Sequence, residues 1–129
     1  MTHELYPVVT GKLAQMRREL TPGPAAAFHD FGNAVFAEGV LSTKTKHIIA
    51  VAVAHVTQCP YCIRGHTKAA LRDGASNEEI MEAIWVAVEM RAGAAFGHSV
   101  IAIAEMNEGG VAAANTEAIG VLRGAHHGH

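Results

Sequence analysis

Helix-capping residues divide much of this sequence into segments of helical length, and they constrain the fold more than any other feature. Ser42 is a favourable N-cap for a helix over 43–57. Pro60 suits the first position of a second helix over 60–72, which Asp73-Gly74 ends. The β-branched residues of 43–57 would also suit a strand, but the length of that segment and its alanines favour a helix.

A capping box marks the start of a longer helix further along the chain. Ser76 is followed three residues later by Glu79, so that each side chain can bond the other residue's backbone N–H group. The apolar periodicity after this pair extends to about Met106. Weaker signals predict three other helices, over 3–20, 25–38 and 115–122, the first two separated by Thr21-Pro-Gly-Pro24. Because no segment has a reliable strand pattern, we expect an all-α fold, a compact domain of five to six helices.

Length and composition bound the domain organisation and the class of function. The 129 residues suit one domain with its own core, which we expect over 1–110, followed by a weakly structured tail over 111–129. Half of the residues are hydrophobic, which excludes a disordered chain, and the formal net charge of −2 argues against nucleic acid as a partner. Since only 17% of the residues are charged, we expect apolar patches that a homo-oligomer covers.

Neither a membrane span nor an export signal is expected. The longest fully apolar run is Ile48–Ala54, well short of the roughly 20 residues that a span needs. The residues after Met1 do not form a basic start followed by an apolar run. We therefore expect a cytoplasmic protein with no membrane partner, whose cysteines are reduced at rest.

The chemistry-bearing residues gather in Cys59-Pro-Tyr-Cys62-Ile-Arg-Gly-His66. Cysteines three apart at a helix start can form a disulfide, and the free N–H groups of that helix stabilise a thiolate. His66 lies one turn after Cys62 on the same face, where an imidazole can take the thiol proton. We therefore expect a redox dithiol in which Cys62 has a lowered pKa and is the more reactive thiol.

The sequence argues against two other kinds of site for this motif, and two alternatives to a redox dithiol stay open. Ile63 stands where a c-type haem site needs histidine, and the βαβ pattern that flanks a thioredoxin-like motif is missing. The two cysteines could be structural residues of a helical core. Alternatively, zinc could be bound tetrahedrally by the four residues His55, Cys59, Cys62 and His66.

A resemblance to a known family begins at Leu41 and covers about residues 40–105. The stretch that carries it reads LSTKTKHIIAVAVAHVTQCPYCIRGH and ends at His66, and residues 67–80 and 83–93 fit the segments that follow. This stretch resembles the carboxymuconolactone decarboxylase family, and more closely its alkylhydroperoxidase D-like branch. The resemblance implies an all-helical fold assembled as a homo-trimer or homo-hexamer, and a thiol-dependent peroxidase or disulfide reductase that acts on hydroperoxides.

The same resemblance implies a role for each residue of the motif. Cys62 attacks the peroxide and becomes a sulfenic acid, Cys59 resolves this to an intramolecular disulfide, and His66 belongs to a proton relay. An external dithiol, on a lipoylated or thioredoxin-like protein, then reduces the disulfide. We expect neither a cofactor nor a bound metal.

His47 marks a departure from the family pattern, because the relay usually has a glutamate at this position, twelve residues before Cys59. An imidazole can relay protons, but it does not supply the negative charge that would orient His66. At about 1.5 Å of rise per residue, His47 would lie roughly 18 Å from Cys59 and His55 only about 6 Å, so spacing favours His55. Both are candidate site residues. Two other functions compete: a non-redox lyase of the decarboxylase type, and a zinc-binding structural oligomer.

Overall fold

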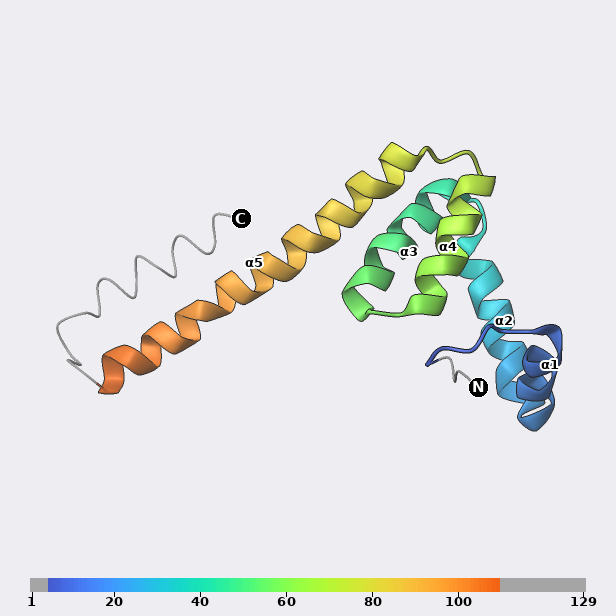
Figure 1. Ribbon diagram of the computed structural model, residues 1–129, viewed down its shortest axis with the longest axis horizontal. Coiled ribbons are helices and arrows are strands. Elements are labelled where there is room, and N and C mark those ends of the chain that lie inside the picture. Colours follow the sequence, from blue (N-terminus) through green and yellow to red (C-terminus); the bar gives the residue numbers. More distant parts are fainter. Residues whose placement is uncertain (1–4, 110–129) are drawn as a thin grey trace. The chain divides into compact units, whose positions relative to one another are not determined.

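The computed structural model describes residues 5–109, which form five α-helices and no strand in that range (Figure 1). The helices are α1 (Gly11–Leu20), α2 (Pro22–Phe36), α3 (Thr43–Thr57), α4 (Pro60–Arg72) and α5 (Asn77–Gly109). The all-α prediction is confirmed. The short helix expected over 115–122 and the tail over 111–129 lie outside the described residues.

The chain packs as two units, one that ends at Ile84 and one that begins at Trp85. The first unit holds α1 to α4 with the first turns of α5, and the second holds the remainder of α5. All the predicted site residues belong to the first unit. The expected domain boundary at residue 110 stays a prediction.

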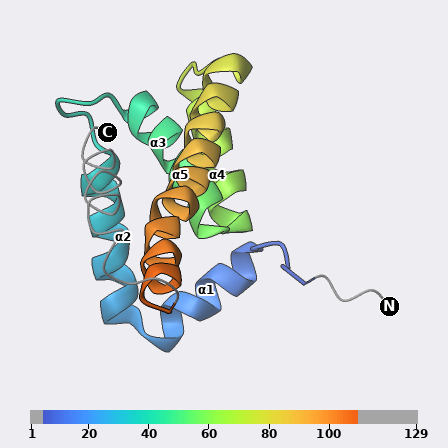
Figure 2. The same ribbon diagram turned by 90° about the vertical axis from the view of Figure 1, so that its left-hand side faces the viewer.

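Helices α3 and α4 form an antiparallel pair that lies side by side in both views (Figures 1 and 2). The bounds of α3 and α4 are those predicted, because capping residues at the helix ends specify them locally. The Ser42 hydroxyl accepts a hydrogen bond from the N–H of Thr45, as an N-cap does. Gln58 then ends α3 in the left-handed region with φ of 59°, and Cys59 caps α4.

The first two helices begin at residues other than those predicted. A helix over 3–20 would hold Pro7 beyond its first turn, where proline removes a backbone hydrogen bond. The helix instead begins at Gly11, and Thr10 caps it by accepting from the N–H of Leu13 at 3.2 Å. Pro22, which we expected to lie in a break between helices, opens α2, because the first turn of a helix does not need its N–H.

The predicted capping box begins α5. Ser76 N–H donates to the Glu79 carboxylate at 2.9 Å, and Glu79 N–H donates to the Ser76 hydroxyl at 3.0 Å. The helix continues for 33 residues, past the expected end at Met106. An 18-residue segment of this helix has a mean hydropathy of 1.2, so by length and composition the helix could cross a membrane. The core helix of a soluble protein meets the same criterion.

The buried core of the described residues is small. Val51 and Ala70 are fully buried and pack with Ala75 and Ile80 where α3, α4 and the start of α5 meet. Although α3 is largely apolar, Val53 on this helix is 52% exposed. Most of the large apolar side chains in the described residues are exposed.

Candidate active site

Cys59 and Cys62 lie at the N-terminus of α4, where the predicted one-turn spacing brings them into contact. Cys59 is the N-cap, and its Sγ accepts a hydrogen bond from the Cys62 N–H at 3.3 Å. Pro60 fills the first helical position without losing a hydrogen bond. Both cysteines are free thiols, Cys59 half-buried and Cys62 exposed. The geometry is therefore that of a reduced pair in which Cys62 is exposed.

The two thiols titrate as a pair, and the anion is favoured on Cys59. The pKa of Cys59 is lowered because the Cys62 thiol and then the Cys62 backbone N–H donate hydrogen bonds to its sulfur. The pKa of Cys62 is raised, first by its bond to Cys59, then by burial and by the charge on Cys59. This direction is opposite to the one we expected from the sequence, because the N-cap sulfur receives the free N–H group that we had assigned to Cys62.

Three rings from three helices form a cluster further along the α3–α4 pair. His47 of α3 and His66 of α4 share a hydrogen bond between their Nδ1 atoms at 3.0 Å. Phe36, the last residue of α2, stacks on both rings, with centroid distances of 4.7 Å to His47 and 4.9 Å to His66. Burial, followed by the proximity of His47, lowers the pKa of His66, so this imidazole is neutral at pH 7 and can act as a base.

The two candidate imidazoles of α3 have different partners, and the spacing argument about their distances to the cysteines stays a prediction. His55 donates from Nδ1 to the carbonyl of Val51 at 2.7 Å, one turn back on its own helix. His47, in contrast, contacts His66 directly. The axial estimate concerned the distance to Cys59, whereas the contact of His47 is with His66 on the facing helix. The four-residue zinc arrangement is not formed either, since no three potential ligands in the described part of the chain are placed to hold one ion.

Asp73 is a neighbour of the histidine pair that sequence reasoning missed. Its Oδ2 lies 3.9 Å from Nε2 of His47, within the range of an ion pair. We had interpreted Asp73 only as a helix stop, which it also is. Phe36 was missed as a site residue as well. No local signal marks either one, because their role depends on α2 and the end of α4 meeting at His47.

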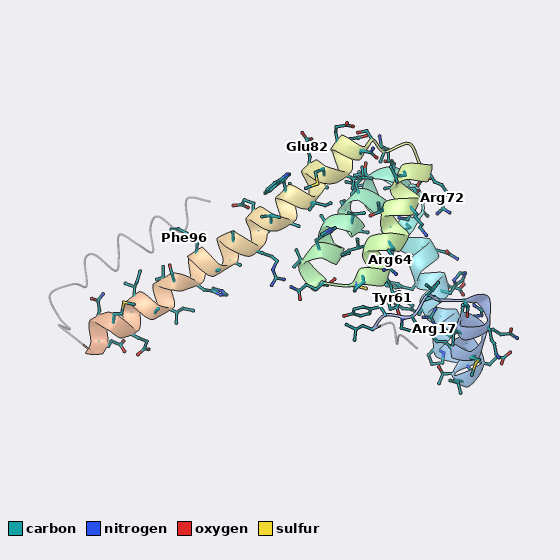
Figure 3. All side chains as sticks on the ribbon, viewed as in Figure 1. Arg17, Tyr61, Arg64, Arg72, Glu82 and Phe96 are labelled. Atoms are coloured by element: carbon teal, nitrogen blue, oxygen red, sulfur yellow. The ribbon has the colours of Figure 1, made fainter. Side chains whose placement is uncertain are left out.

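Tyr61, one of the two residues between the cysteines, contacts the N-terminal segment. The Tyr61 hydroxyl donates to the carbonyl of Pro7 at 2.7 Å, and its ring meets that of Tyr6 edge to face at 5.9 Å. Figure 3 shows Tyr61 at the start of α4 beside this segment. The segment before α1 therefore flanks the cysteine motif on one side.

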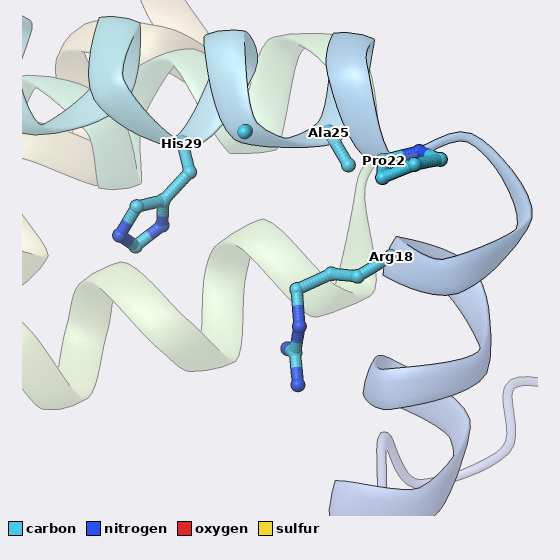
Figure 4. Close-up of a pocket in the computed structure, with 5 residues that line it drawn as sticks. Arg18, Pro22, Ala25 and His29 are labelled. Atoms are coloured by element: carbon cyan, nitrogen blue, oxygen red, sulfur yellow. The ribbon is translucent and has the colours of Figure 1, made fainter.

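Two surface pockets lie near the site elements without enclosing the cysteines. The larger, of 490 Å³, is lined by Arg18 of α1 and His29 of α2 over an apolar wall that includes Ala25 (Figure 4). The second, of 340 Å³, lies between α2 and α3, and Phe36 is part of its wall. Phe36 thus separates an apolar groove from the histidine pair.

The central part of the chain is similar to known proteins. Residues 22–105 match the carboxymuconolactone decarboxylase family. The chain is 62% identical over 82 residues to a protein of Paracoccus denitrificans named uncharacterized protein 4 in cox locus, a match that covers 64% of this chain and 74% of the relative. It is 35% identical over 72 residues to an uncharacterized protein of Cupriavidus necator, covering 56% of this chain and 64% of that protein.

Two crystal structures share the fold. One is the apo form of a carboxymuconolactone decarboxylase family protein from Legionella pneumophila, with 37% identity and a TM-score of 0.56 over 61% of this chain and 70% of that one. The other is a protein from Methanobacterium thermoautotrophicum, with 37% identity and a TM-score of 0.60 over 63% of this chain and 91% of that one. The family match over residues 22–105 includes the cysteine motif and the histidine pair.

Proposed function

This chain belongs to the carboxymuconolactone decarboxylase family, and within that family we propose that it is a thiol-dependent peroxidase that reduces hydroperoxides through Cys59 and Cys62. The observation that carries the proposal is the hydrogen bond from the Cys62 N–H to the Cys59 sulfur at a helix start. A buried structural pair would not leave Cys62 exposed. A lyase reaction on a lactone would not need the pair at all.

The reaction begins with attack by sulfur on the terminal oxygen of the hydroperoxide. The Cys62 thiolate forms an S–O bond, the O–O bond breaks, and the alkoxide takes a proton and leaves as an alcohol. Cys62 is then a sulfenic acid. The Cys59 thiolate attacks the Cys62 sulfur, the S–O bond breaks, and hydroxide leaves as water after protonation. An external dithiol, on a lipoylated or thioredoxin-like protein in the cytoplasm, reduces the resulting disulfide by thiol–disulfide exchange and is itself oxidised.

The raised pKa of Cys62 explains why this chemistry needs a base. A thiol whose neighbour carries the negative charge does not ionise by itself at pH 7, so its proton must be accepted by another group. His66 lies one turn along the same helix and is neutral at this pH, because burial lowers its pKa. We assign it the role of general base, with His47 as the next member of the relay.

Oxidation is expected to link Cys59 and Cys62 within one chain. Side chains three apart on a helix lie about 5–6 Å apart at Cβ, close enough for a small movement to bring their sulfurs into bonding geometry. One equivalent of peroxide followed by non-reducing peptide mapping should yield a single peptide that contains both residues joined. A map with only intermolecular links, or with two unreacted thiols, would contradict both the pairing and the peroxidase proposal.

We also propose that the protein is a homo-oligomer, a trimer or a hexamer. In the single chain Phe96 is 80% exposed and Trp85 is 61% exposed, and monomeric soluble proteins rarely expose large contiguous apolar patches. Sedimentation at micromolar concentration should therefore give a mass three or six times that of the 13.6 kDa chain. A single species at the mass of one chain would exclude this assembly.

A further inference from the structure

We propose that Asp73 is a positioning residue of the site: its carboxylate holds a proton on Nε2 of His47, and this leaves Nε2 of His66 free as the basic nitrogen. The inference rests on the proposed function only for its consequence in catalysis. The arrangement of protons that it describes follows from the contacts among three side chains.

The bond between the two imidazoles allows only two arrangements when both rings are neutral. The Nδ1 atoms lie 3.0 Å apart, so one of them must carry a proton and the other must accept it. If His47 donates, His66 must carry its own proton on Nε2, and neither nitrogen of His66 is free to act as a base. If His66 donates, its Nε2 has a free lone pair, and His47 carries its proton on Nε2.

Asp73 selects the second arrangement. Its Oδ2 lies 3.9 Å from Nε2 of His47, so a negative charge faces that nitrogen and favours a proton on it. The first arrangement would instead place a lone pair of His47 opposite the carboxylate. Asp73 thereby does for His47 what an aspartate does in a catalytic triad, where it sets the tautomer and orientation of an imidazole without becoming protonated.

The other charged side chains near this point have partners of their own. Lys44 of α3 pairs with Glu79 of α5 at 3.2 Å. Lys46 of α3 donates to the carbonyl of Ala37, just after α2. Phe36 contributes only an aromatic face from α2. The carboxylate of Asp73 is therefore the negative charge that the described contacts place against His47.

The position of Asp73 in α4 argues for a role beyond helix capping. It is the C-cap residue, where the negative end of the helix dipole disfavours a carboxylate. Its capping bonds run from its backbone N–H to the carbonyls of Ala69 and Leu71, and these do not need the side chain. Asparagine, which suits helix ends, should therefore cap α4 at least as well as aspartate does. A loss of function on this substitution would then come from the histidine pair.

The test compares Asp73→Asn with Asp73→Glu, and uses Glu82→Gln as a matched control that removes an exposed carboxylate from the first turns of α5. Imidazole ¹⁵N chemical shifts at pH 7.5 report which nitrogen of His47 and His66 carries the proton. In parallel, iodoacetamide alkylation of Cys62, measured in a Cys59→Ser background, reports how well the thiol is deprotonated. Neither measurement requires peroxide turnover.

We expect the wild-type protein to show a protonated Nε2 in His47 and an unprotonated Nε2 in His66. In Asp73→Asn both arrangements of protons on His47 and His66 should be populated, and alkylation of Cys62 should slow about tenfold at pH 7. This is a smaller loss than the 10²–10⁴-fold rate contribution of a general base, because His66 itself remains. Asp73→Glu should restore most of the rate, Glu82→Gln should change nothing, and thermal stability should be equal in all. Unchanged nitrogen shifts or an unchanged alkylation rate in Asp73→Asn would overturn the inference. A wild-type protein with the expected shifts but no peroxide consumption would overturn the proposed function instead.

Discussion

Replacing Cys62 with serine is expected to abolish catalytic consumption of an organic hydroperoxide, with a loss of at least about a thousandfold. The hydroxyl of serine is a far weaker nucleophile than a thiolate at neutral pH, and removal of the nucleophile from a catalytic unit costs several orders of magnitude. Cys59→Ser should behave differently. It should react once with peroxide, form a stable sulfenic acid at Cys62, and then stop, because no second thiol displaces the oxygen.

The measurement is peroxide consumption with an excess of a dithiol reductant, combined with dimedone trapping and mass spectrometry. Cys59→Ser should give one dimedone adduct at Cys62, and circular dichroism should confirm that both variants keep their helices. If dimedone instead labels Cys59 in Cys62→Ser, then the lower pKa of Cys59 decides the chemistry and the roles of the two cysteines are exchanged. Full activity in both variants would exclude a dithiol peroxidase.

Replacing His66 with alanine is expected to lower the rate of peroxide reduction about a hundredfold at pH 7, within the usual contribution of a general base. The loss should shrink as pH rises, since hydroxide can then remove the proton from Cys62. Because the pKa of Cys62 is raised, this recovery should lie above the ordinary thiol pKa of about 8.5. The wild-type rate should fall only in acid, because the pKa of His66 is lowered and its basic form persists below about pH 6.5.

His55→Ala is the matched control for this experiment, since it removes an imidazole from the neighbouring helix. His55 is bonded to the carbonyl of Val51 within α3, so we expect the rate and its pH profile to change less than twofold. His47→Ala should lower the rate, because it breaks the bond to His66. A larger effect from His55→Ala than from His47→Ala would contradict the relay that we propose.

Several features of the fold could be predicted from the sequence because their causes are local. Ser42 caps α3 by bonding a residue three positions away, and the Ser76–Glu79 capping box works over the same distance. The one-turn spacing of Cys59 and Cys62 likewise depends only on the start of α4. The predicted start of α1 was wrong, because the apolar spacing was followed without weighing the cost of Pro7. Proline beyond the first turn of a helix removes a backbone hydrogen bond.

The neighbours of His47 and His66 were decided by tertiary structure. His47 and His66 are nineteen residues apart, and Asp73 and Phe36 come from segments whose meeting no local pattern reports. Estimates along a helix axis ranked His55 and His47 by distance to the cysteines, and they contain no information on which imidazole meets His66. The sequence by itself therefore determined α3, α4 and the start of α5, with the cysteine pair at a helix start. Packing among α2, α3 and the end of α4 decided which imidazole lies beside His66 and which carboxylate lies beside His47, because side chains distant in sequence meet only when their helices are placed.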